Sequence, residues 1–249
     1  MATGAYDSST ARAYVRATDS VFRRDVISHT TRAELGDLRG LSVLDVGCGE
    51  GRDARWARAQ GAVRVLGVDL SEEMVRMARQ RSAGDEHLTF VHGDGTALPD
   101  TGRFDVALAV NVLHYALSRD SLARMYQQVY DRMHPGGRLV AVCADSRCDP
   151  SRPGPDAYDI TIERPAGAEE GAEVRQRFLR DGRPVAEIVY RHWPRDLHER
   201  LAHQAGFTHL RWSALRCTAD TVPRRGPDRH ARYLSNPHLV VLTARVAPR

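Results

Sequence analysis

Glycines stand at alternate positions, Gly47, Gly49 and Gly51, directly after a short apolar run. Glycine adopts positive φ angles and has no Cβ, so backbone N–H groups at such positions can approach a ligand closely. A second apolar run, 64–68, is followed by Asp69, eighteen residues after Gly51. A carboxylate there can accept hydrogen bonds from both hydroxyl groups of a ribose. Together these features predict a site for a cofactor that carries a nucleoside.

The glycine spacing separates two classes of nucleoside cofactor. A dinucleotide site uses G-x-G-x-x-G and seats a pyrophosphate on a helix N-terminus. Here the spacing is G-x-G-x-G, with Asp45 at the strand end and Glu50 and Asp53 where the next helix opens. Carboxylates repel a phosphate and attract a sulfonium cation. The pattern therefore favours S-adenosylmethionine over NAD and conflicts with an NAD(P)-dependent oxidoreductase.

On these motifs the chain resembles the class I S-adenosylmethionine-dependent methyltransferases over roughly residues 41–145. The resemblance implies that the glycine loop lines the methionine part of the cofactor, that Asp69 holds the ribose, and that Leu70 and Met74 pack on adenine. Asp94 is placed to meet the adenine amino group, and Tyr6 or Tyr14 to close over the cofactor. The implied cofactor residues are Tyr14, Asp45, Gly47, Cys48, Gly49, Asp69, Leu70, Met74, Asp94, Gly95, Asn111 and Val112.

The implied reaction is an in-line displacement, in which an N, O or C atom attacks the methyl group of the sulfonium. Alignment and desolvation can supply much of the acceleration, and a base is needed only if the nucleophile must lose a proton. His114 follows the fourth apolar run and is the candidate base, because imidazole titrates near neutral pH. A cofactor contact is its alternative role. Tyr115 is the candidate for orienting the acceptor, or else a wall of the pocket.

Apolar runs and helical patterns alternate along the chain, which predicts a mostly parallel sheet with helices on both faces. We expect a Rossmann-like α/β fold with seven strands, at 41–46, 64–68, 88–92, 104–110, 138–143, 207–215 and 238–246. Helices are expected within 8–35, over 52–60, after the N-cap Ser71, and over 120–134 and 194–205, with Pro135-Gly136-Gly137 as a turn.

Two segments, 146–192 and 216–237, interrupt this alternation. Asp181-Gly182 between alternating runs predicts a β-hairpin in the first. Long loops in compact domains are usually functional, and ligands of open α/β sheets bind beyond the strand carboxyl ends. We therefore expect one domain over 1–249, with 1–40 as an N-terminal helical cap, 41–145 as the cofactor-binding core, and both segments as the substrate cover. Aromatic candidates in the cover are Tyr158, Tyr190, His192 and Trp193.

Composition narrows the function classes further. The 36 basic residues are dispersed among 32 acidic ones for a net charge of +4, which is weak support for nucleic-acid binding. No apolar run approaches the roughly 20 residues of a membrane span, and Met1–Arg16 lacks the apolar core of a signal peptide. The cysteines have neither metal-ligand nor disulfide spacing. These features predict a cytoplasmic protein without a metal.

The tail extends the resemblance to small-molecule methyltransferases of bacterial natural-product pathways, weakly to the toxoflavin-type N-methyltransferases. It is carried by Trp193, Ala205-Gly206-Phe207, Trp212, Asn236-Pro237 and Leu242-Thr243-Ala244-Arg245. We expect methyl transfer to nitrogen or oxygen of a small molecule, with an aromatic or heterocyclic acceptor as one option and a monomer or homodimer as the state. The alternatives are an RNA or protein methyltransferase of the same fold, and a relative that binds the cofactor without methylating.

Overall fold

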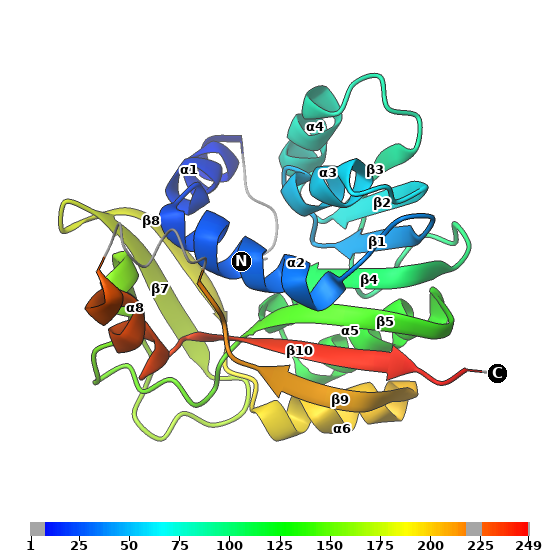
Figure 1. Ribbon diagram of the computed structural model, residues 1–249. Helices are drawn as coiled ribbons and strands as arrows, with labels where there is room; N and C mark the ends of the chain where they lie inside the picture. The colour runs from blue at the N-terminus through cyan, green and yellow to red at the C-terminus, as the bar shows by residue number, and fades with distance from the viewer. Residues whose placement is uncertain (1–7, 218–225, 249) are drawn as a thin grey trace.

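A seven-stranded, mostly parallel sheet forms the centre of the protein in the computed structural model, which describes residues 8–217 and 226–248 (Figure 1). The strand order is β3-β2-β1-β4-β5-β10-β9, and β10 runs antiparallel to both of its neighbours. The predicted Rossmann-like sheet is therefore confirmed. Its strands are β1 Ser42–Val46, β2 Arg64–Asp69, β3 Leu88–His92, β4 Phe104–Val110, β5 Met133–Ala144, β9 Phe207–Ser213 and β10 Leu239–Val246.

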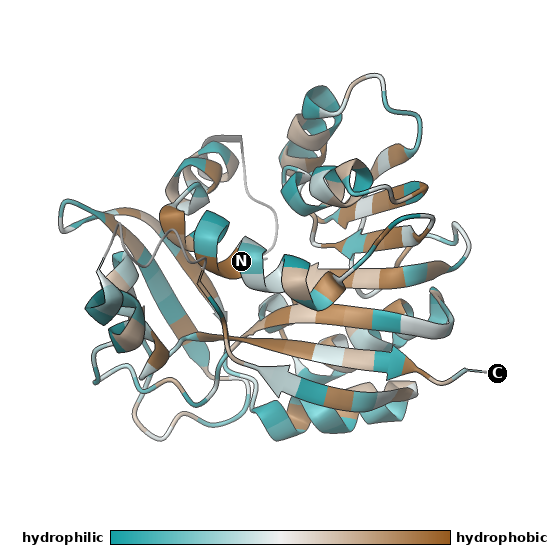
Figure 2. Cartoon of the chain, viewed as in Figure 1, coloured by the Kyte–Doolittle hydropathy of each residue, from teal (hydrophilic) through white to brown (hydrophobic). Residues whose placement is uncertain are grey.

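Helices cover both faces of this sheet, because successive residues of a strand point to opposite faces and are apolar on both. In β1, Leu44 and Val46 join the core under α5 and α6, whereas Val43 joins the core on the opposite side. Hydrophobic residues accordingly follow the strands, and polar residues cover the outer sides of the helices (Figure 2). The covering helices are α3 Arg52–Ala59, α4 Glu72–Arg81, α5 Arg119–Asp131 and α6 Arg195–Ala205.

A second, antiparallel sheet stands beside the central sheet (Figure 1). It consists of β6 Ile160–Glu163, β7 Glu173–Arg180 and β8 Arg183–Arg191 in the part of the chain that the structure describes. The β7–β8 turn has positive φ angles at Asp181 (51°) and Gly182 (73°), as a tight hairpin turn requires. The predicted hairpin is thus present.

The N-terminal segment bridges the two sheets. It forms α1 Ser8–Thr18, the π-helix η1 Phe22–Ser28 and α2 His29–Leu35. Helix α1 contacts β8 of the second sheet and α4 of the central layer. Residues of α1 and η1 line the same cavity as the carboxyl ends of the central strands, whereas α2 packs on β5 and β10. Tyr6 lies outside the described residues.

Three local expectations differ from the structure. The Pro135-Gly136-Gly137 turn lies inside β5, which starts at Met133; a register shift between Phe104 and Val106 absorbs these residues as a bulge. The short strand β6 and the helix α8 Pro227–Leu234 occupy stretches expected to be loop. Both pack on partners remote in sequence, because α8 contacts the 3₁₀ turn Pro155–Tyr158 and β6 pairs with β7. No helix within 8–217 or 226–248 is long and apolar enough to cross a membrane.

Candidate functional site

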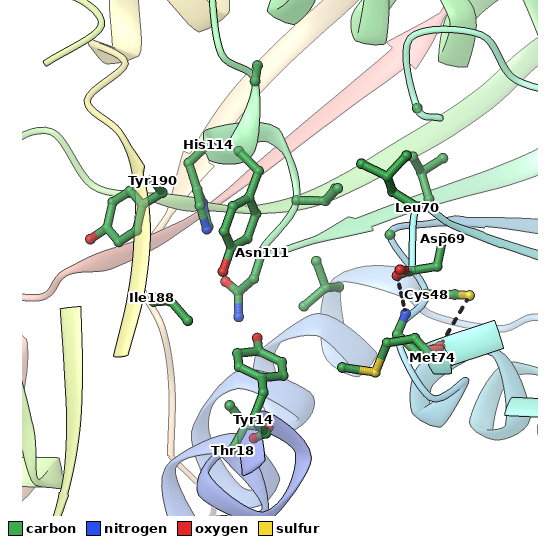
Figure 3. A pocket seen from close by; sticks show the side chains of 18 of the residues that line it. Tyr14, Thr18, Cys48, Asp69, Leu70, Met74, Asn111, His114, Ile188 and Tyr190 are labelled. Atoms are coloured by element: carbon green, nitrogen blue, oxygen red, sulfur yellow. Dashed lines mark hydrogen bonds between the residues drawn. The ribbon is translucent and has the colours of Figure 1, made fainter. Parts of the chain in front are cut away.

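A cavity of about 840 Å³ lies where the central sheet, the N-terminal helices and the second sheet meet (Figure 3). Its floor is built from the carboxyl ends of β1 to β4, the edge at which ligands of open α/β sheets bind. The floor residues are Val46, Gly47, Cys48, Gly49, Val68, Asp69, Leu70, Gly93, Asp94, Gly95, Val110, Asn111 and Val112. The implied cofactor residues except Asp45, together with His114 and Tyr115, all line this cavity.

The loop after β1 forms a cradle that depends on glycine. The N–H groups of Gly47 and Cys48 both donate to the Val68 carbonyl, at 2.8 and 3.1 Å. Gly47 has φ of 69°, and a Cβ there would lie 2.5 Å from the Val112 side chain. Gly49 has φ of 54°, and a Cβ there would meet nothing within 4 Å. Gly47 is thus needed for packing, whereas Gly49 leaves open space beside its backbone that a ligand can fill.

Asp69 fixes this loop and remains available to a ligand. One carboxylate oxygen accepts a hydrogen bond from the Gly49 N–H at 2.7 Å, and the other accepts from the Ser71 N–H at 2.9 Å. Burial raises the pKa of Asp69, and the two backbone donors act against that rise. Each oxygen has a second lone pair, so the carboxylate can still accept from two ribose hydroxyl groups.

The end of the cavity beyond β2 and β3 has an apolar wall and a polar turn. Leu70 leaves 43% of its surface exposed, while Met74 behind it is buried. The Ser71 hydroxyl accepts from the Met74 N–H, so the predicted N-cap of α4 is present and positions this side chain. Asp94 accepts a hydrogen bond from the Thr96 N–H at 2.8 Å, and the turn from Asp94 to Thr96 lines the cavity. These residues fit a flat, apolar ring with a polar edge.

Asp45 does not reach the cavity, which corrects its expected place among the cofactor contacts. It lies on β1 on the same side as Val43, and only 2% of its surface is exposed. Burial and the neighbouring Asp53 carboxylate raise its pKa well above the usual range. Strand alternation explains the difference, because Val46 lines the cavity whereas its neighbour Asp45 points to the other side of β1.

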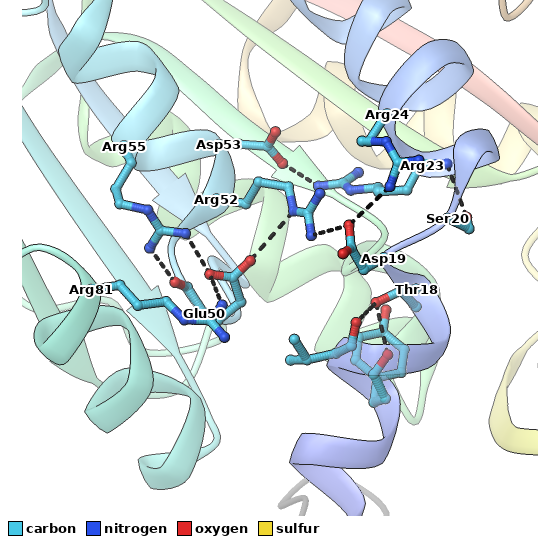
Figure 4. A network of polar contacts seen from close by, with 12 residues as sticks. Thr18, Asp19, Ser20, Arg23, Arg24, Glu50, Arg52, Asp53, Arg55 and Arg81 are labelled. Carbon is cyan, nitrogen blue, oxygen red and sulfur yellow. Dashed lines mark hydrogen bonds and ion pairs between the residues drawn. The ribbon is translucent and has the colours of Figure 1, made fainter.

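Arginines neutralise the acidic opening of α3 (Figure 4). Glu50 forms ion pairs with Arg52, Arg55 and Arg81, and Asp53 pairs with Arg23. Burial opposes ionisation of Glu50, but hydrogen bonds from the arginines outweigh it and lower its pKa. The sequence suggested that the carboxylates at the start of α3 attract a sulfonium cation. In the structure both carboxylates are paired with arginines, so their negative charge is already compensated.

His114 is held as a neutral imidazole. It is 3% exposed, and burial lowers its pKa to about 3. Its Nδ1 accepts a hydrogen bond from the Ala144 N–H at 3.3 Å, which leaves the ring proton on Nε2. The expectation of titration near neutral pH is therefore wrong. A neutral ring with this tautomer donates a hydrogen bond more readily than it takes a proton.

The second sheet supplies a wall that the sequence analysis did not assign, apart from Tyr190. Ile160, Gln176, Phe178, Ile188 and Tyr190 all line the cavity. The His114 ring lies 4.7 Å from the Tyr190 ring, centroid to centroid, and Tyr14 meets Phe178 edge-on at 6.3 Å. The alternation of side chains in β7 and β8 could have predicted this wall, because every second residue of a strand points to the same face of its sheet.

The remaining sequence candidates divide between the cavity and the core. Tyr115 lines the cavity, and its ring lies 4.9 Å from that of His114. Asn111 also lines it, with a positive φ of 56° and a buried side-chain oxygen that has no hydrogen-bond partner in the described residues. Tyr158 packs against Phe22 in the core and does not line this cavity. His192 and Trp193 are likewise absent from its lining.

Comparison with known proteins matches residues 43–137 to a methyltransferase-domain family. A demethylmenaquinone methyltransferase from Clavibacter sepedonicus is 36% identical over 45% of this chain and 44% of its own length. The chain spans less than half the length of the first curated relatives that it matches. The matched segment runs from β1 into β5 and leaves out the N-terminal helices and the second sheet.

Solved structures share the whole architecture. An S-adenosylmethionine-dependent methyltransferase from Mesorhizobium loti is 24% identical, with a TM-score of 0.65 over 92% of this chain and 99% of that one. A 1,6-didemethyltoxoflavin-N1-methyltransferase from Burkholderia thailandensis, solved with its substrate and S-adenosylhomocysteine, is 23% identical, with a TM-score of 0.58 over 96% and 84%. Residues 43–137 therefore resemble a methyltransferase domain in sequence, and the chain as a whole has the fold of class I methyltransferases.

Proposed function

We propose that this protein is an S-adenosylmethionine-dependent methyltransferase that acts on a nitrogen or oxygen atom of a small molecule. The observation that carries the proposal is the glycine cradle. Gly49 leaves open space at the cavity surface while its N–H is held by Asp69, so a carboxylate and a bare backbone face the same ligand. When bound, S-adenosylmethionine would supply an electrophilic methyl group on its sulfonium.

The chain's own residues would hold the cofactor along the floor of the cavity. Asp69 would accept from the ribose hydroxyl groups, and Leu70 and Met74 would pack on the adenine ring. Asp94 and Gly95 would border the adenine edge, and Asn111 and Val112 the methionine part. Tyr14 stands on α1 at the opposite wall, where it would cover the cofactor from the N-terminal side.

The second sheet would bind the acceptor. Its inner face is mostly apolar and aromatic, and the Glu187 carboxylate at its edge is already paired with Arg175 and Arg177. Gln176 is buried, with 6% of its surface exposed, and gives this wall an uncharged hydrogen-bonding group. In this proposal residues 146–192 would serve as the substrate cover. An uncharged, flat acceptor suits this wall best.

The chain would position the acceptor and exclude water, and the acceptor would bring its own nucleophile. His114 is neutral, with its proton on Nε2, and burial raises the pKa values of Tyr14 and Tyr190 above their usual range. These groups can donate hydrogen bonds to an acceptor but take up no proton near pH 7. A neutral amine, a ring nitrogen or an already ionised oxygen meets this requirement.

Incubation with methyl-labelled S-adenosylmethionine tests the proposal. A panel of phenols, amines and N-heterocycles should give labelled small-molecule product, detected by mass. Label found only in added protein or RNA would favour the alternative methyltransferase classes, and tight cofactor binding without any transfer would favour a non-methylating relative. A role in natural-product biosynthesis and a cytoplasmic location stay predictions, the former supported by the likeness to the toxoflavin enzyme.

A further inference from the structure

Gln176 is a buried polar residue on a mostly apolar wall of the cavity. It lies in the middle of β7, the central strand of the second sheet. Its direct cross-strand partners are Ile162 on β6 and Ile188 on β8. Alternate residues of a strand share a face, so Val174 and Phe178 flank it on the same side. These four apolar side chains pack in one cluster around the position of Gln176.

The carboxamide of Gln176 has two donor hydrogens and an acceptor oxygen to satisfy. No hydrogen bond joins this group to any residue that the structure describes. An unpaired amide among apolar groups lowers stability, and an apolar side chain of the same size would avoid that cost. Because Gln176 lines the ligand cavity, a bound molecule can supply the missing partners. The arrangement indicates a role in binding rather than in folding.

The chemistry of a carboxamide limits the group that can satisfy it. Its N–H donor and its oxygen acceptor lie side by side in one plane, so a ligand with an adjacent C=O and N–H pairs with both at once. Lactams and other cyclic cis-amides present such an edge. A carboxylate would bring a charge among apolar neighbours, and an ether or a ring nitrogen would leave the carboxamide oxygen unpaired. An uncharged cis-amide edge therefore matches Gln176 best.

The wall that carries Gln176 lies across the cavity from the proposed cofactor site. Figure 3 shows Ile188 and Tyr190 on one side of the cavity and Asp69 on the other. Tyr190 follows Ile188 by two residues on the same face of β8, and its ring lies 4.7 Å from that of His114. Gln176 thus faces the side of the cavity that the proposed function leaves for the acceptor.

We propose that the Gln176 carboxamide binds the acceptor through a cyclic cis-amide edge, so that the acceptor is a lactam-type heterocycle; this inference rests on the proposed function. Gln176 is then a specificity-determining residue, which orients the ring and takes no part in proton transfer. A molecule without this edge leaves the buried amide unpaired, and it binds about ten- to hundred-fold more weakly.

Paired small molecules test this assignment in protein saturated with S-adenosylhomocysteine. Carbostyril, isocarbostyril and phthalazinone are bicyclic lactams, and the O-methyl ether of each has the same rings without the N–H. We expect the wild type to bind at least one lactam about ten-fold or more tightly than its ether in NMR titration. Gln176→Met keeps the length of the side chain and removes its hydrogen bonds. It should reduce this preference to within about two-fold and leave S-adenosylhomocysteine affinity unchanged.

Two control variants separate hydrogen bonding from shape. Gln127→Met makes the same change on α5 outside the cavity, where Gln127 pairs with Asp131, and should leave the preference unchanged. Ile188→Val trims the cross-strand partner of Gln176 and should weaken both members of a pair alike. The urea midpoint of ligand-free Gln176→Met should equal or exceed that of the wild type, because an unpaired buried amide is removed. A lower midpoint would assign the amide to the fold and overturn the proposal.

The possible failures remain distinct. Wild-type protein that binds S-adenosylhomocysteine and prefers no lactam over its ether would overturn this inference and leave the proposed function intact. A Gln176→Met protein that keeps the preference would also overturn it, because another group would then recognise the cis-amide edge. Folded protein that does not bind S-adenosylhomocysteine would contradict the proposed function itself, and this inference with it.

Discussion

Replacing Gly49 with alanine separates ligand contact from folding in the glycine loop. The φ of Gly49 is 54°, so an alanine there costs about 1–2 kcal/mol of stability through its left-handed backbone conformation. No atom lies within 4 Å of the added methyl group, so no clash in the ligand-free protein adds to this cost. In the proposed complex the methyl group would occupy space filled by the cofactor.

The expected loss of affinity follows from overpacking. Inserting a methyl group into a filled site costs about 1–3 kcal/mol, which corresponds to about five- to hundred-fold weaker binding. Calorimetric titration with S-adenosylhomocysteine and urea unfolding measure the two effects separately. Gly40→Ala is the matched control, since Gly40 has φ of 75°, nothing within 4 Å of its Cβ position and no place in the cavity.

A contrasting variant tests the reasoning from the other side. Gly47→Ala would place its Cβ 2.5 Å from Val112, so it should destabilise the protein by more than the backbone term alone. If Gly49→Ala bound S-adenosylhomocysteine as tightly as the wild type, the open space beside Gly49 would not be the ligand site, and the cradle argument would be refuted.

Three further predictions concern charge and protonation. Asp69→Asn should weaken S-adenosylhomocysteine binding about ten- to hundred-fold, the value of a charge-assisted hydrogen bond, and unchanged calorimetric affinity would remove the ribose assignment. The ring protons of His114 should show no titration by NMR between pH 8 and about 5, since its pKa is about 3; a midpoint near 6.5 would restore it as a candidate base. Stability should fall as the pH drops below about 6.5, because unfolding lets buried histidines take up protons that their folded pKa values of about 3 to 4 exclude. By pH 5 the free energy of unfolding should fall by about 2 kcal/mol for each of the three buried histidines, His114, His198 and His238. Urea unfolding measures this loss, and a free energy of unfolding that does not change with pH would contradict the prediction.

The floor of the cavity could be predicted because its determinants are local. Glycine conformations, a strand-end carboxylate and the N-cap Ser71 each act within a few residues of sequence. The strands β3 and β4 have the predicted bounds for the same reason, since a short apolar run between polar turns fixes both ends. The prediction that Asp45 lines the site was wrong, because the side of β1 to which a residue points decides whether it reaches the cavity.

The cavity wall formed by the second sheet could not be predicted because it depends on contacts across long stretches of chain. Gln176 and Ile188 line the same cavity as His114 only because the second sheet packs beside the central one. The pKa of His114 is likewise set by burial under Tyr190, from a strand more than seventy residues away in sequence. The π-helix η1 has no local sequence signal, and the ion pair of Arg23 with Asp53 joins residues 30 positions apart in the chain.

Calorimetric titration of the purified protein with S-adenosylhomocysteine tests the central claim most directly, together with mass analysis of any ligand carried through purification. The glycine cradle and the Asp69 carboxylate predict one site per chain with micromolar affinity, and adenosyl ligand in the purified sample would agree with it. Absence of binding by protein shown to be folded by circular dichroism and cooperative unfolding would contradict the proposal that this cavity holds S-adenosylmethionine.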